Sequence, residues 1–269
     1  MHEENQWGLH LKSGVRKFVF RDLQKIDGYI DPPDALVFLS LIEKQRQEKL
    51  YGGLAEIGVY YGRSYFLLRK ISAPDDNVLA IDLFDIEADG AQYQRFLDNG
   101  RSLGIPVDED LVITGDSTGL DPQAIIDRVG QVRFFSIDGG HLLRHIVADS
   151  RLAKSVLADH GIIAFDDTFN PAWPEVTVGV SDFLRRNSDT FAAFCMTKYK
   201  TYVCRRDFHE FYRAALGRAR HLLPFEHAEM DFLGSKVLRL HDPINRRVAY
   251  ELLRRLGLGA ISEWAYRPA

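Results

Sequence analysis

The sequence has few cysteines, no long apolar run and no strong excess of one charge. Only two of the 269 residues are cysteines, Cys195 and Cys204, which excludes a disulfide framework and favours a reducing compartment. The densest apolar stretch, residues 35–42, is far shorter than the roughly 20 residues that span a bilayer. Residues 1–14 are too polar for a secretory signal. We therefore expect a cytoplasmic protein with no membrane partner.

The charge balance argues against nucleic acid as the main partner. The chain has 34 Lys and Arg against 38 Asp and Glu, a net charge of −4, made up of +4 in residues 201–269 and −8 in residues 1–200. An enzyme that acts on nucleic acid normally carries a basic excess around its site. The hydrophobic fraction of 46% fits an ordinary globular protein and excludes disorder.

Short β-branched runs alternate with helical patterns from about residue 50 to 205, which is typical of a parallel sheet covered by helices. Seven strands are expected, at residues 54–57, 78–83, 111–114, 132–137, 161–165, 191–196 and 201–204. Only four residues separate the last two, so they form an antiparallel hairpin. The predicted fold is α/β, a Rossmann-like seven-stranded sheet with an antiparallel C-terminal hairpin and appended helices.

Extensions flank this core on both sides. Residues 1–49 are expected to form an N-terminal helical extension, with a helix from Asp34 to Glu48, and residues 50–205 the core. Residues 206–269 form a C-terminal extension packed on the core, with a short strand at 236–240 and a helix with an apolar row from Ile244 to Leu256. Such apolar appended helices suit a homodimer interface.

The most informative segment is the turn Glu56–Ser64, Glu-Ile-Gly-Val-Tyr-Tyr-Gly-Arg-Ser, between a predicted strand and a helix. Its two glycines permit a sharp bend and a close approach to a ligand, and the helix start offers free N–H groups. The paired early glycines of G-x-G-x-x-G are missing, so the turn does not predict a dinucleotide site. Alone it also fits an ordinary connecting loop. An acid at Glu56 would repel a pyrophosphate but suits a cationic amino-acid moiety.

Polar groups also follow the second and third strands. Asp82 ends one of them, and Gly115-Asp116-Ser117 follows the other. Open α/β sheets bind ligands at this carboxyl edge, where a carboxylate suits the two hydroxyls of a ribose and neighbouring polar groups suit an adenine edge. Asp82 taken singly also fits a cap for the next helix. Together the three turns predict a nucleoside pocket.

A second acidic group follows the fourth and fifth strands, as Asp138-Gly139-Gly140-His141 and Asp166-Asp167. Neighbouring strands lie about 5 Å apart, so these carboxylates converge at one edge. Their mutual repulsion must be relieved by raised pKa values or by a cation, and oxygen ligands favour Mg²⁺, with Mn²⁺ or Ca²⁺ as alternatives. The alternative is a purely structural role, in which Asp166 and Asp167 cap a loop and His141 makes a structural hydrogen bond.

These motifs together resemble the class I S-adenosylmethionine-dependent methyltransferases over residues 50–205, and more narrowly the metal-dependent O-methyltransferases of the catechol and macrocin types. The resemblance implies that S-adenosylmethionine is the cofactor. It places the methionine part of the cofactor against the turn, at Glu56, Gly58, Tyr61, Gly62 and Ser64. It places the ribose at Asp82 and the adenine at Asp116 and Ser117, with Asp138 also near the cofactor.

The same resemblance assigns Asp138, Asp166 and Asp167 as metal ligands. His141 stands where catechol enzymes carry a lysine that takes the hydroxyl proton, so His141 and Asp138 are the catalytic candidates. The loop that follows, with Phe169 and Trp173, is a candidate acceptor site.

The sequence thus predicts an O-methyltransferase that uses S-adenosylmethionine and Mg²⁺ on a small-molecule acceptor, a sugar or natural-product diol or a phenolic compound. A nicotinamide-dependent oxidoreductase is disfavoured because both G-x-G-x-x-G and a suitably placed Tyr-x-x-x-Lys are missing. A catalytically inactive binding module and a hydroxylating relative stay open as alternatives.

Overall fold

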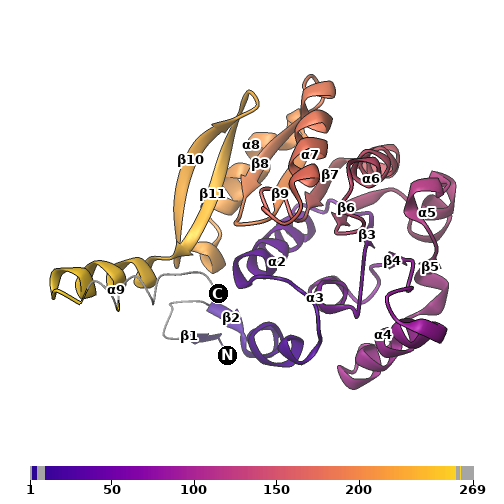
Figure 1. Ribbon diagram of the computed structural model, residues 1–269, viewed down its shortest axis with the longest axis horizontal. Coiled ribbons are helices and arrows are strands. Elements are labelled where there is room, and N and C mark those ends of the chain that lie inside the picture. Colours follow the sequence, from indigo (N-terminus) through magenta and orange to yellow (C-terminus); the bar gives the residue numbers. More distant parts are fainter. Residues whose placement is uncertain (1, 5–9, 259–260, 262–269) are drawn as a thin grey trace.

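A nine-stranded sheet between two layers of helices forms the centre of the molecule (Figure 1) in a computed structural model that describes residues 2–4, 10–258 and 261. The seven predicted strands are all present: β3 Gly53–Ile57, β4 Val78–Asp82, β5 Val112–Thr114, β6 Val132–Ile137, β7 Leu157–Phe165, β8 Phe191–Met196 and β9 Thr201–Arg205. Their order across the sheet is β8-β9-β7-β6-β3-β4-β5. The strands from β7 to β5 run parallel, whereas β9 is antiparallel to both of its neighbours. The predicted α/β class and antiparallel hairpin are confirmed.

The predicted number of seven strands is wrong, because a C-terminal hairpin extends the sheet. β10 (Phe225–Phe232) and β11 (Ser235–Pro243) pair with each other, and β11 adds in parallel to β8, with Leu238 opposite Cys195. Without β11, β8 would expose a row of unpaired backbone groups at the sheet edge. The hairpin satisfies that edge and buries Val237 and Leu238.

Two hydrophobic cores, one on each face of the sheet, hold the helices. One face carries α2 Pro32–Gln47, α3 Arg63–Ile71, α4 Ala91–Ser102 and α8 Arg206–Gly217; the other carries α5 Pro122–Val129, α6 Leu143–Val156 and α7 Pro174–Arg186. Helix α5 begins at a sequence that favours a helix start: Asp121 accepts a hydrogen bond from the Gln123 backbone N–H, and Pro122 occupies the first turn.

Smaller elements complete the chain. They are β1 His2–Glu4, β2 His10–Lys12, α1 Ser13–Lys17, the π-helix η1 Phe18–Asp22, the 3₁₀ turns η2 Leu23–Lys25, η3 Ala88–Gly90, η4 Glu109–Leu111, η5 Ser117–Gly119 and η6 Arg220–Leu222, and α9 Ile244–Arg255. The N-terminal extension is thus helical with one added strand pair. The expected domain boundaries stay predictions.

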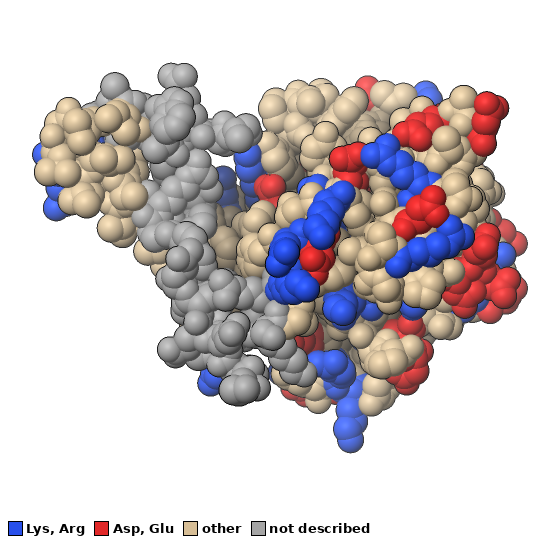
Figure 2. Space-filling view, turned by 90° about the horizontal axis from the view of Figure 1, so that it is seen from below, with Lys and Arg blue, Asp and Glu red and all other residues tan. Residues whose placement is uncertain are grey.

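Helix α9 projects from the body (Figure 1). The apolar row that was predicted from Ile244 to Leu256 is exposed. The exposed fractions run from 47% at Ile244 to 64% at Leu256. The expected homodimer stays a prediction. Among the described residues, no helix combines the length and the apolar character that a membrane span requires. On the face drawn in Figure 2, acidic and basic side chains are interspersed over the helical body.

Strand register aligns the candidate site. Ile57 of β3 lies opposite Ile81 of β4 and Ile137 of β6. Ile137 in turn lies opposite Phe165 of β7. Because these strands are parallel, the residues that follow them share one edge of the sheet: Gly58, Asp82, Asp138 and Asp166.

Candidate active site

A cavity of about 920 Å³ opens at this carboxyl edge. Its walls are the loops after five parallel strands, together with residues 24–34 and the turn between β8 and β9. Most of the predicted site residues line it: Gly58, Ser64, Asp82, Asp116, Ser117, Asp138, His141, Asp166 and Asp167. Three predicted cofactor residues, Glu56, Tyr61 and Gly62, do not line the cavity.

The glycine turn bends where the sequence requires it. Gly58 has a φ of +81°, and a Cβ atom there would lie 1.9 Å from the backbone oxygen of Asp138. Gly62 has a φ of +97°, immediately before α3, where a Cβ atom would meet the Phe66 ring at 2.3 Å. Glycine is therefore needed at both positions, and the turn packs directly on the loop after β6.

The three residues behind the cavity wall support the turn. Glu56 is fully buried, and burial raises its pKa to about 7 although the hydroxyls of Ser64 and Ser136 oppose the shift. The buried Tyr61 donates its hydroxyl hydrogen bond to Glu87, away from the cavity. Their positions fit a structural role behind the turn.

Asp82 ties two loops together. Its carboxylate accepts hydrogen bonds from the backbone N–H groups of Tyr60 and Phe84, both at 2.8 Å. Both donors have a φ of 53°, a conformation that side chains rarely adopt and that Asp82 helps to hold. Burial raises the pKa of Asp82, and these N–H groups oppose the rise. Asp82 therefore holds the two loops by hydrogen bonds and also lines the cavity.

Two carboxylates lie beside the loop after β5. Asp116 accepts hydrogen bonds from the backbone N–H and the hydroxyl of Thr118, at 2.9 and 2.7 Å, and these bonds lower its pKa. Asp149, which sequence reasoning missed, is fully buried on α6. Burial raises its pKa to about 6, although the Ser117 hydroxyl opposes the rise. Its signal in the sequence is its spacing, three residues after the buried Ile146, which places a charge on the apolar face.

The raised pKa of Asp149 predicts a pH-dependent stability difference. A carboxyl whose pKa is higher in the folded state favours folding when protonated, and it loses that contribution as pH rises through about 6. The asparagine amide that replaces it in Asp149→Asn cannot ionise. We therefore expect the stability of this variant relative to wild type to improve by about 2 kcal/mol between pH 4.5 and pH 8. Urea unfolding of both proteins at the two pH values measures the difference, and a constant offset would contradict it.

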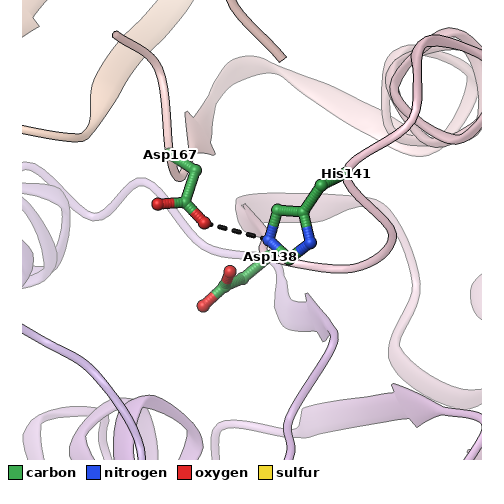
Figure 3. Close-up of side chains that lie close together, drawn as sticks. All are labelled: Asp138, His141 and Asp167. Carbon is green, nitrogen blue, oxygen red and sulfur yellow. Dashed lines mark ion pairs between the residues drawn. The ribbon is translucent and has the colours of Figure 1, made fainter. Parts of the chain in front are cut away.

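Asp138, His141 and Asp167 converge on one point of the cavity (Figure 3). One ligand atom from each lies within 4.8 Å of the others, and His141 Nε2 is 2.9 Å from Asp167 Oδ2. The His141 ring stacks on Trp173 with centroids 4.3 Å apart. Burial tends to raise the pKa of Asp167, but hydrogen bonds from His141 and Asn170 bring it below its usual value. The imidazole and the carboxylate therefore hold each other in place.

Asp166 lies beside this group but has a different partner. Its carboxylate forms an ion pair with Lys200, whose side chain is 3% exposed. Burial and the nearby Asp166 carboxylate raise the pKa of Asp138 well above its usual range. Sequence reasoning missed Lys200, which it took as one residue of a tight turn.

Residues 55–168 match the family profile of a methyltransferase domain. The fold is similar to that of the O-methyltransferase NovP, with a TM-score of 0.52, 17% identity and coverage of 62% of this chain and 77% of that one. It is also similar to a Staphylococcus aureus protein assigned provisionally as a caffeoyl-CoA O-methyltransferase, with a TM-score of 0.51 and 13% identity. That match covers 72% of this chain and 93% of the other. No curated protein matches the chain in sequence. At such identities these structures show a shared fold, and residues 55–168 of that fold match the family profile of a methyltransferase domain.

Proposed function

We propose that the protein is an S-adenosylmethionine-dependent O-methyltransferase that acts on a hydroxyl of a small acceptor, with help from a divalent cation such as Mg²⁺. One observation carries the proposal: the cavity joins a glycine turn and two strand-end carboxylates to the group Asp138, His141 and Asp167. The two structures compared above are described as O-methyltransferases, which supports oxygen as the methylated atom.

The cofactor is proposed to lie across the strand ends. Gly58 and Ser64 would receive the methionine part, because the turn is compact and the start of α3 is free of side-chain caps. Asp82 would bind the ribose hydroxyls with the acceptor capacity that its two backbone donors leave unused. Asp116 and Ser117 would border the adenine.

The residues at the other end of the cavity fit a divalent cation. Two carboxylates and an imidazole offer three donor atoms within 4.8 Å of one another, a spacing that one coordination shell allows. A cation held there would lower the pKa of the acceptor hydroxyl. The protein's own task is to orient the donors, and the Trp173 stack and the Asn170 hydrogen bond do so for His141 and Asp167.

The reaction is a direct displacement. S-adenosylmethionine held in the cavity would supply the methyl group: a bond would form between the acceptor oxygen and the methyl carbon as the carbon–sulfur bond broke, and S-adenosylhomocysteine would remain. The hydroxyl proton passes to a base at this end of the cavity, with His141 and Asp138 as the candidates. The main contribution of the cavity is alignment, because both reactants are held in one enclosed site.

Exposed apolar side chains surround the cavity mouth and support an acceptor with ring faces. Tyr29 is 86% exposed, Ile86 65%, Leu83 51% and Trp173 43%, and all four line the cavity. Phe169 lies outside the lining and packs against Phe232, with centroids 5.8 Å apart. We favour a glycosyl or natural-product acceptor with neighbouring hydroxyls, which a cation can chelate.

Titration calorimetry with S-adenosylhomocysteine, with and without Mg²⁺ and with NADH as the control, tests the proposal. Binding of S-adenosylhomocysteine but not NADH would support it and would justify a screen of glycosyl and phenolic acceptors with S-adenosylmethionine. Binding of NADH alone would favour the oxidoreductase. Binding of S-adenosylhomocysteine without turnover of any acceptor would favour the inactive binding module.

Asp82→Ala is expected to weaken the binding of S-adenosylhomocysteine by about tenfold to a hundredfold, because hydrogen bonds to a charged group contribute about 1.5–3 kcal/mol. The substitution removes the ribose partner and frees the loops at Tyr60 and Phe84. Calorimetry measures the loss. Asp75→Ala, at an exposed carboxylate in the turn before β4 that does not line the cavity, is the matched control. Unchanged affinity in Asp82→Ala would remove Asp82 from the ribose site.

A further inference from the structure

Lys200 lies at the acidic edge, the edge of the sheet where Asp138 and Asp166 follow β6 and β7. The strand that it precedes, β9, runs in the opposite direction to those parallel strands. β9 runs antiparallel to β7, and Thr201 lies opposite Phe165. The residue before β9, Lys200, therefore faces the residue after β7, Asp166, and the two side chains form an ion pair. The antiparallel strand thus delivers a cation to an edge where the parallel strands deliver acids.

The surroundings of Lys200 fix it there. Its ammonium group is 6.0 Å from the centroid of the Phe38 ring, and its backbone N–H donates to the Thr197 hydroxyl at 3.1 Å. Asp34, the next acid beneath it, already accepts hydrogen bonds from Thr197 and Tyr202 at 2.7 and 2.6 Å. Asp166 is therefore the main partner of a cation that is only 3% exposed.

Moving Asp166 onto a second cation would take from the buried Lys200 its ion-pair partner and leave it only the weaker attraction of Asp138 and Asp34. Breaking a buried pair by removing one partner is strongly destabilising. The described residues that do converge as a ligand set are Asp138, His141 and Asp167. We propose that Lys200 is a positioning residue that holds Asp166 out of the cation site, so that His141 completes the ligand set with Asp138 and Asp167.

This inference rests on the proposed function, because it concerns the cation of the same cavity. It has two consequences. His141 acts as a ligand and not as the proton acceptor, so the second carboxylate oxygen of Asp138 is the remaining candidate base. An imidazole among the ligands also favours Mn²⁺ over Mg²⁺ more than an all-oxygen site does.

Calorimetric titration of the full chain with Mn²⁺, with S-adenosylhomocysteine present, tests the inference. Asp167→Asn is expected to lower the Mn²⁺ affinity about tenfold or more, and Asp166→Asn by less than about fivefold. In Lys200→Met the released Asp166 joins the site, so the affinity rises and adding Asp166→Asn then costs about tenfold. Lys200→Arg keeps the wild-type pattern, and Lys236→Met, at an exposed lysine that does not line the cavity, is the matched control.

Equal losses of Mn²⁺ affinity in Asp166→Asn and Asp167→Asn, with Lys200 present, would overturn the inference. That comparison decides even where Lys200→Met does not fold. A wild-type protein that binds S-adenosylhomocysteine but not Mn²⁺ would overturn the inference and leave the methyltransferase proposal standing. A wild-type protein that binds neither would overturn both.

Discussion

Replacing Asp167 with alanine is expected to lower the cation-dependent methyl-transfer rate by about a hundredfold or more, while the affinity for S-adenosylhomocysteine changes by less than about threefold. Asp167 supplies a carboxylate to the cation group and also holds His141 through the 2.9 Å contact with Nε2. One substitution therefore removes a ligand and the orientation of a second. The half of the cavity proposed for the cofactor, around Gly58 and Asp82, is left intact.

Two measurements on the same preparation separate these effects. Initial rates with and without Mg²⁺ report the cation-dependent step, and calorimetry with S-adenosylhomocysteine reports the cofactor site. Asp189→Ala, at an exposed aspartate in the turn after α7, is the control for removal of a surface carboxylate. Equal Mg²⁺-dependent rates in Asp167→Ala and wild type would show that Asp167 is not part of the cation site.

The strand ends could be predicted because they follow from local patterns. Each parallel strand is a short apolar run, fully buried in the case of β3 and β6, and it stops where a glycine or an acid begins. Parallel strands in one sheet align their carboxyl ends. Naming the strands therefore also placed Gly58, Asp138 and Asp166 along one edge, as the register shows.

The acidic edge as a whole could not be predicted, because its partners are distant in the chain. Asp34 and Thr197 are 163 residues apart, yet they form a hydrogen bond beneath Lys200. No local periodicity signals such a contact. The direction of β9 is the clue that the sequence offered, since an antiparallel strand that starts beside the end of β7 must bring its preceding residue, Lys200, to Asp166.

In the C-terminal hairpin, β11 confirms the strand predicted at residues 236–240, whereas β10 was missed for a different reason. β10 alternates polar and apolar residues, and most of its side chains are half-buried or exposed, so it lacks the apolar run of the core strands. The turn chemistry was the available signal. Leu233 and Gly234 both have positive φ, at 45° and 78°, as a two-residue hairpin turn requires.

Gly58→Ala is expected to lower the free energy of unfolding by about 3–5 kcal/mol, or to prevent folding, and to abolish binding of S-adenosylhomocysteine in any protein that folds. The new Cβ atom would lie 1.9 Å from the Asp138 backbone oxygen, and the φ of +81° adds strain that alanine does not tolerate. Relief requires the loops after β3 and β6 to separate. That movement would open the cofactor turn and displace Asp138 together.

Gly119→Ala is the matched control, because Gly119 also lies in a loop after a strand but a Cβ atom there meets nothing within 4 Å. This control is expected to change the free energy of unfolding by less than about 1 kcal/mol. Urea unfolding of both variants gives the two values. Similar free energies of unfolding for the two variants would mean that the loops after β3 and β6 can move apart with little loss of stability. The close contact at Gly58 would then not be what joins the cofactor turn to the cation group.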